Sequence, residues 1–102
     1  MRIALSLALV LVGAPAFAAS ADPATGEQIA KAECASCHAI GIDDESRDRK
    51  APRFVDVAKM PSTTELSLKV FLRSSHKNMP NIILSREEID SLASYILGLG
   101  GK

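Results

Sequence analysis

The sequence predicts an all-α fold. Three segments combine the Ser/Thr-x-x-Glu/Gln spacing of a helix-capping box with apolar residues that favour a helix after it. No stretch alternates apolar and polar residues as a strand does, and no internal repeat is present. A chain of 102 residues has room for one small domain. Its 12 basic and 12 acidic residues cancel, so it lacks the positive excess of a nucleic-acid-binding protein.

The first 21 residues have the composition of a secretory signal peptide. Arg2 gives a positive start, residues 3–12 form an apolar run, and two small-x-small sites end at Ala18 and Ala21. A glycine and a proline interrupt the apolar run before it reaches the roughly 18 residues that a membrane helix needs. We expect cleavage after Ala18 or Ala21, and a periplasmic product without a stable membrane anchor.

Residues 22–102 form the predicted working domain. Cleavage after Ala21 is favoured because Asp22-Pro23 then begins the first helix. The domain retains 11 basic and 12 acidic residues, since only Arg2 is lost, and its net charge is −1. An exported domain of this size has a large surface relative to its core and usually needs a disulfide, a metal or a cofactor.

The first half of this domain is predicted to be one helix followed by a long loop. Residues 25–28 have capping-box spacing, and residues 29–33 favour a helix that runs into Cys34. Residues 41–60 are polar and charged without a clear period and predict a loop, with a short helical turn at 54–58. A loop this long in a small domain normally wraps around something.

Two further helices complete the expected fold. Residues 62–65 repeat the capping-box pattern, and helical spacing continues to Ser74. Residues 85–88 form a third box with acidic residues at the positive end of the helix dipole. The apolar residues that follow recur at three and four positions as far as Leu99, and glycines at 98, 100 and 101 stop the helix.

The two cysteines are not expected to stabilise the domain as a disulfide. A disulfide between Cys34 and Cys37 would close a very small loop and constrain little of the unfolded chain. Residues 34–38 instead form a C-x-x-C-H motif, in which two thiols add to the vinyl groups of a haem and the adjacent imidazole reaches the iron. We therefore expect one haem c, attached through Cys34 and Cys37 and ligated by His38.

Three other interpretations of the motif stay open. A thioredoxin-like redox pair needs a βαβ pattern that the sequence lacks. The cysteines could also be a structural pair without a cofactor. A zinc site would depart from the usual two-pair spacing and would have to recruit Cys34, Cys37, His38 and His76.

Met79 is the leading candidate for the opposite side of the iron. It precedes Pro80, which disfavours helical geometry, and it lies in a polar segment where a core methionine has little reason to be. A thioether ligand favours the reduced iron and raises its potential. Met79 could instead pack in the core. The competing ligands are Met60, which also precedes a proline, and His76, which would give a bis-histidine iron.

These features resemble one family. They are Gly26 eight residues before the first cysteine, the motif at 34–38, Ala51-Pro52, Met79-Pro80, Leu84-Ser85 and Tyr95. Together they make residues 22–99 similar to a small class I bacterial c-type cytochrome. The chain departs from the family at Ala30, where an aromatic residue is common, and in having no tryptophan.

The resemblance implies the cytochrome c fold, in which three main helices and a long loop surround one covalently attached haem. It also implies that the first and last helices cross near Gly26, against residues 92–96. In the same way, the Pro52 carbonyl would accept the Nδ1 hydrogen of His38 and orient the ring. The nearby cations that could neutralise the haem propionates are Arg49, Lys50 and Arg53.

Ligation by both His38 and Met79 would leave the iron no open position, so we expect one-electron transfer rather than enzyme activity. The partners would be redox proteins such as a dehydrogenase, oxidase or reductase, docking on a monomer at the haem edge. The candidates for a basic rim there are Lys59, Lys69, Arg73 and Lys77. Two alternatives are an open-site haem sensor or peroxidase and an obligate electron-transfer subunit of a larger dehydrogenase or oxidase complex.

Overall fold

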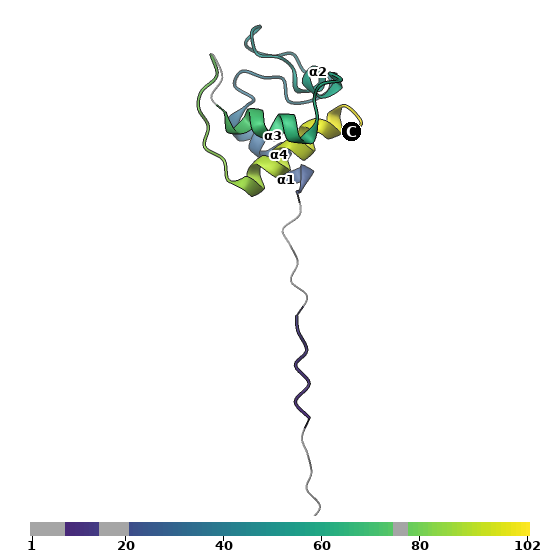
Figure 1. The fold of residues 1–102 in the computed structure, drawn as a ribbon. Helices are drawn as coiled ribbons and strands as arrows, with labels where there is room; N and C mark the ends of the chain where they lie inside the picture. The colour runs from purple at the N-terminus through teal and green to yellow at the C-terminus, as the bar shows by residue number, and fades with distance from the viewer. Residues whose placement is uncertain (1–7, 15–20, 75–77) are drawn as a thin grey trace, which may run out of the picture.

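The computed structural model describes residues 8–14, 21–74 and 78–102. Its helices are α1 (Pro23–Glu33), α2 (Phe54–Lys59), α3 (Glu65–Arg73) and α4 (Arg86–Leu99), as Figure 1 shows. The described ranges contain no strand, which confirms the all-α prediction. Most of the predicted signal peptide, including Ala18, lies outside these ranges. Over the same ranges, no helix has the length and apolar character needed to cross a membrane.

The start of α1 is set by Asp22 rather than by the predicted box at residues 25–28. The Asp22 carboxylate accepts a hydrogen bond from the Ala24 amide at 3.1 Å, and Pro23 occupies the first turn. The Thr25 hydroxyl donates to the same carboxylate at 2.8 Å. The box at Thr25 was therefore wrong, because this threonine supports an earlier cap instead of forming one.

The short helical turn expected near residue 54 is present as α2. The helix after it begins two residues later than predicted. Its N-cap is Thr64, and a capping box joins Thr64 to Ser67, so the box proposed at residues 62–65 was wrong. Several hydroxyl-bearing residues precede α3. Thr64 is the one that caps the helix, and it exchanges hydrogen bonds with Ser67, three residues further along the chain.

The last helix begins as the sequence predicts. Ser85 is its N-cap, and Ser85 and Glu88 form a reciprocal capping box. Gly98 does not stop the helix, which continues to Leu99 and is capped by Gly100.

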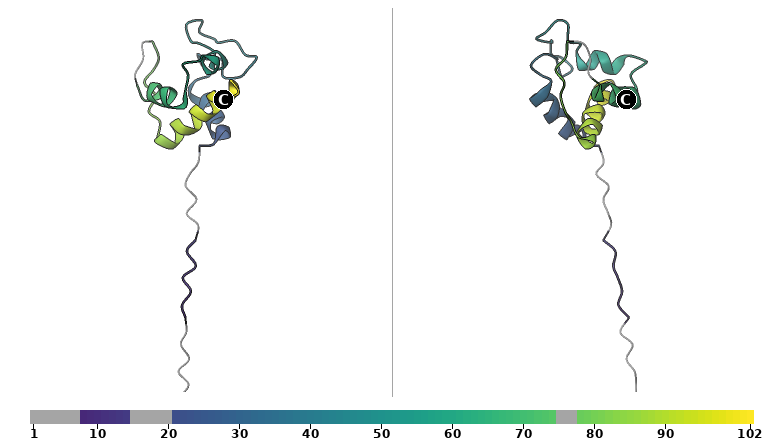
Figure 2. Two further views of the ribbon diagram at one scale, coloured as in Figure 1. Left: turned by 45° about the vertical axis from the view of Figure 1, so that its right-hand side comes forward. Right: turned by 60° about the vertical axis from the view of Figure 1, so that its left-hand side comes forward.

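The fold is organised around α4. Each of α1, α2 and α3 packs against it, and within the described residues the backbones of those three helices do not approach one another closely. The views in Figure 2 show α4 running through the middle of the helical domain, with the long connection from α1 to α2 looping away from it. The core that α4 centres on includes Ala30, Phe54, Leu68, Leu92 and Ile96.

The α1 and α4 helices cross at Gly26. A methyl group added at Gly26 would overlap the Ser91 carbonyl and would also crowd the Tyr95 Cβ. The close approach confirms the crossing that the family resemblance implied at this glycine, because only a residue without a Cβ fits there.

Candidate functional site

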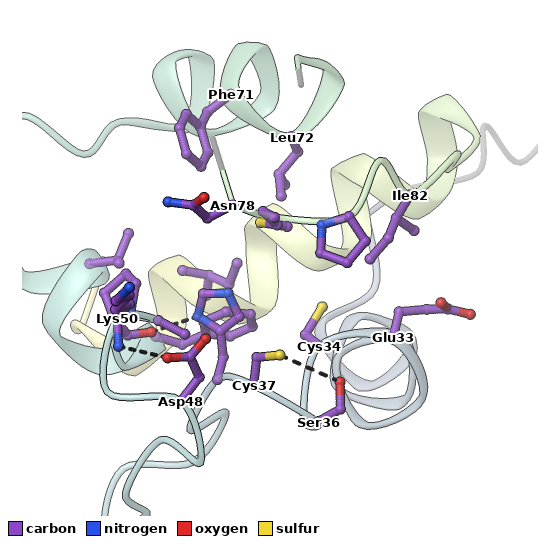
Figure 3. Close-up of a pocket in the computed structure, with 18 of the residues that line it drawn as sticks. Glu33, Cys34, Ser36, Cys37, Asp48, Lys50, Phe71, Leu72, Asn78 and Ile82 are labelled. Carbon is purple, nitrogen blue, oxygen red and sulfur yellow. Dashed lines mark hydrogen bonds between the residues drawn. The ribbon is translucent and has the colours of Figure 1, made fainter. Parts of the chain in front are cut away.

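A partly open cavity of about 220 Å³ lies beside α4. Figure 3 shows one wall carrying Cys34, Cys37 and Lys50, and Phe71 and Asn78 on the opposite side. The lining comes from the end of α1, the loop after it, α2, α3, the segment before α4 and α4 itself. Residues far apart in the sequence therefore meet around one space.

The C-x-x-C-H motif continues α1 as one tight turn. The Cys34 amide donates to the Ala30 carbonyl at 2.9 Å, and the His38 amide donates to the Cys34 carbonyl at 2.9 Å. This turn brings Cys34, Cys37 and His38 together in the cavity lining. The local backbone explains why the chemical groups of the motif can act on one ligand.

The Cys34 thiol does not lie in the environment of a reactive redox cysteine. Both cysteines are free, and Cys34 is buried while Cys37 is half-buried. Burial, followed by the charge of Glu33, raises the pKa of the Cys34 thiol to about 11. Thioredoxin-like cysteines depend on a lowered pKa, so this environment opposes the redox-pair interpretation.

The zinc interpretation also lacks support in the described part of the chain. There, no group of three or more His, Cys, Asp or Glu side chains could hold a metal ion. His76, which that interpretation needed and which was also a candidate iron ligand, lies outside the described residues.

The His38 ring is held in one orientation. Its Nδ1 lies 2.7 Å from the Pro52 carbonyl oxygen, and because a carbonyl can only accept, Nδ1 carries the proton. The Phe54 ring packs beside it, with the ring centroids 5.2 Å apart. With Nδ1 occupied, Nε2 is the nitrogen left to bind a metal.

Of the three sequence candidates for the opposite ligand, the structure describes the two methionines, Met79 and Met60, and places them differently. Met79 lines the cavity. It follows Asn78, whose φ of 67° is left-handed, a conformation that asparagine tolerates better than most residues. Met60 does not line the cavity and is 48% exposed. Met79 is thus the described methionine whose position suits a ligand in this space.

Several cavity residues were not singled out from the sequence. Helical spacing had marked some of them as apolar positions without indicating which side faces a ligand. They form an apolar shell made of Phe54, Val57, Leu68, Phe71, Leu72, Ile82 and Ile96. Such a shell lowers the local dielectric around a bound group.

The three candidate propionate partners differ in position. Lys50 lines the cavity, and no other lysine or arginine among the described residues does so. Arg53 forms a salt bridge with Asp56, with its Nε 2.9 Å from Oδ2, and its Nη1 lies 3.9 Å from Glu45 Oε1. Arg49 is exposed and does not line the cavity.

The expected basic rim is only partly available. Lys69 is paired with Glu65 on its own helix at 2.5 Å and with Asp90 on α4 at 3.1 Å. Lys59 and Arg73 are exposed, whereas Lys77 lies outside the described residues. Lys69 therefore ties α3 to α4, and its charge is largely neutralised.

The donor set fits a covalently attached haem. Two thiols and an imidazole lie on one wall, a thioether lies in the same lining, and the remaining walls are mainly apolar. No buried side-chain polar atom among the described residues lacks a partner, so no orphaned group argues for a different polar ligand.

Comparisons with known proteins agree with this chemistry. A family model described as "Cytochrome C oxidase, cbb3-type, subunit III" matches residues 21–96. Cytochrome c-552 of Bradyrhizobium diazoefficiens is 34% identical over 90 residues, which cover 88% of this chain and 86% of that protein. No solved structure matches.

Proposed function

Since this chain belongs to the c-type cytochrome family described as cytochrome c oxidase, cbb3-type, subunit III, we propose that it is a one-electron carrier with His38 and Met79 as axial ligands. Family membership establishes a covalently bound haem c and a role in electron transfer. When bound, the haem supplies reversible one-electron chemistry at its iron. The observation that carries the finer proposal is the bond from His38 Nδ1 to Pro52, in a cavity that Met79 also lines.

Each site residue has a defined task in this proposal. Cys34 and Cys37 hold the haem through thioether bonds. His38 binds the iron through Nε2, and the Pro52 carbonyl fixes the ring and makes it a stronger donor. Met79 closes the other side, so the site offers no open position for substrate or oxygen. The apolar shell excludes water, which limits reorganisation during electron transfer.

Lys50 is proposed as the partner of a haem propionate. The thioether bonds and the propionates lie at different edges of a haem, and Figure 3 shows Lys50 across the lower wall from Cys34. The turn that carries Lys50 is tied to the motif, since the Asp48 amide donates to the Cys37 carbonyl at 3.1 Å. This anchorage supports a fixed position for the cation relative to the haem.

We further propose that residues 1–21 are a cleaved signal peptide and that residues 22–102 are the haem domain. Export to the periplasm is supported by the leader composition and by membership of a family that is generally exported. The partners would be exported or membrane redox proteins.

Optical spectra of the holoprotein test the ligation. Wild type should show the weak far-red ferric band of a thioether-bound iron and should not bind carbon monoxide in the ferrous state. Met79→Ala should lose the band and bind carbon monoxide. Met60→Ala is the matched control. Met60 also precedes a proline, but Met60 does not line the cavity. Carbon monoxide binding by wild type would instead support the sensor or peroxidase alternative.

A further inference from the structure

Three consecutive residues, His38, Ala39 and Ile40, are held from different directions. The His38 ring bonds to Pro52 as described above. The Ala39 amide donates to Ser46 Oγ at 3.0 Å, and the Ala39 carbonyl accepts from the Phe54 amide at 3.0 Å. Ala39 and Ile40 are both buried. The chain directly after the proposed iron ligand is therefore tethered at every residue.

The tether at Ile40 comes from α4. The Tyr95 hydroxyl donates to the Ile40 carbonyl at 2.6 Å, across 55 positions of sequence. Burial, followed by the charges of Glu27 and Asp44, raises the pKa of Tyr95, so the hydroxyl stays protonated and able to donate at neutral pH.

The Tyr95 end of this bond lies in a closely packed part of the fold. Its Cβ lies at the tight crossing where Gly26 meets α4. The hydroxyl therefore projects from a helix that α1 holds closely, rather than from a mobile loop. Such a fixed donor can restrain the segment that it bonds.

We infer that Tyr95 is a positioning residue for His38, acting through the Ile40 carbonyl to hold residues 38–40 so that the His38 ring keeps its short bond to Pro52. This inference rests on the proposed ligation of iron by His38. The bond to Pro52 increases the donor strength of the imidazole. A stronger donor favours the ferric state, so loosening the segment should favour the ferrous state.

The variant that isolates this effect is Tyr95→Phe, which removes the hydroxyl and keeps the ring that packs at the helix crossing. Ser46→Ala removes a second tether of the same segment, from Ala39. Ser91→Ala is the matched control. Ser91 lies one turn earlier on α4, and Ser91→Ala also removes one hydrogen bond. That bond holds the Asp22 backbone nitrogen at 3.1 Å, which becomes the N-terminal amine after cleavage at Ala21, and it leads to α1 rather than to residues 38–40.

The first measurement is a redox titration of the three holoprotein variants. Tyr95→Phe and Ser46→Ala should each raise the ferrous-to-ferric ratio at a fixed applied potential by about threefold, or roughly 30 mV for a one-electron couple. Ser91→Ala should leave the ratio at the wild-type value, whatever its effect on stability. The inference is overturned if Tyr95→Phe and Ser91→Ala give the same ratio.

The second measurement follows the His38 Nδ1 proton by NMR in the ferrous protein. Its exchange with solvent should be faster in Tyr95→Phe than in Ser91→Ala, and equal exchange would also overturn the inference. In wild type, the large ring-current shift of a residue beneath a haem tests the ligation itself. Absence of that shift in wild type would contradict the proposed function. If the shift is present but the ferrous-to-ferric ratio and the proton exchange of Tyr95→Phe equal those of Ser91→Ala, only the role of Tyr95 is contradicted.

Discussion

Gly26 packs directly against the main-chain carbonyl of Ser91, leaving no room for a side chain where α1 and α4 cross. Gly26→Ala would force the two helices apart, because the atom it meets belongs to the backbone. Overpacking of this kind costs about 1–3 kcal/mol of unfolding free energy, and we expect the upper end. Chemical denaturation of the holoprotein measures the loss.

Gly98→Ala is the matched control for that substitution. Gly98 also lies in a helix, but an added Cβ there meets no atom within 4 Å. Alanine is the better helix former, so this variant should gain roughly 0.5–1 kcal/mol. Equal destabilisation by the two variants would contradict the steric explanation.

Asp22 should make stability depend on pH at the acidic end. The Thr25 hydroxyl and then the Ala24 amide hold the pKa of Asp22 below its ordinary value of about 3.9. Because the folded pKa is the lower one, this stabilisation is complete above the ordinary value and is lost as the pH falls through the folded pKa. Asp22→Asn keeps a capping oxygen but cannot titrate.

Thermal unfolding at a series of pH values tests this effect. The advantage of wild type over Asp22→Asn should shrink below about pH 4. Thr25→Val removes the largest cause of the lowered pKa and should move the loss to higher pH. A difference between wild type and Asp22→Asn that stays constant with pH would exclude the linkage.

Lys50 should raise the reduction potential by stabilising the more negative reduced state. Lys50→Gln is expected to lower the potential, and Arg49→Gln to lower it less, although each removes one positive charge. The difference should decrease as salt is added, because a partly exposed charge is screened. Equal shifts in the two variants at low salt would place neither cation beside a propionate.

The proposed cleavage site after Ala21 can be tested by measuring the intact mass of the protein. Protein recovered from the periplasm should begin at Asp22, so its intact mass should equal that of residues 22–102 plus one haem. The haem should remain with the polypeptide after denaturation because the thioether bonds are covalent. A mass that includes residues 19–21 would show that cleavage follows Ala18 instead.

Local signals explain which parts of the fold could be predicted. Ser85 and Glu88 interact within one turn, so the start of α4 was correct from the sequence. Near α1, Asp22 and Thr25 could each form a cap, and the sequence pattern did not show that Thr25 would donate to Asp22. The start of α3 was misplaced for a similar reason, since several neighbouring hydroxyl residues compete for one cap.

The site residues also fall into two groups, those that a local sequence pattern predicts and those that it does not. Residues 34–38 carry their chemistry within five positions, so the haem attachment could be inferred without a structure. The bond from Tyr95 to Ile40 spans 55 positions, and no local pattern predicts it. The apolar periodicity of α3 likewise did not indicate that Leu68, Phe71 and Leu72 would line a cavity.

The central place of α4 has a consequence for biosynthesis. In the described ranges the backbones of helices α1, α2 and α3 approach α4 closely but do not approach one another closely, yet α4 is the last of the four to be synthesised. The earlier helices therefore lack their main packing partner while the chain is still emerging, and helices this short are marginal alone. We expect Cys34 and Cys37 to stay accessible during that interval, so that haem attachment can precede docking of α4 and the bound haem can help complete the core.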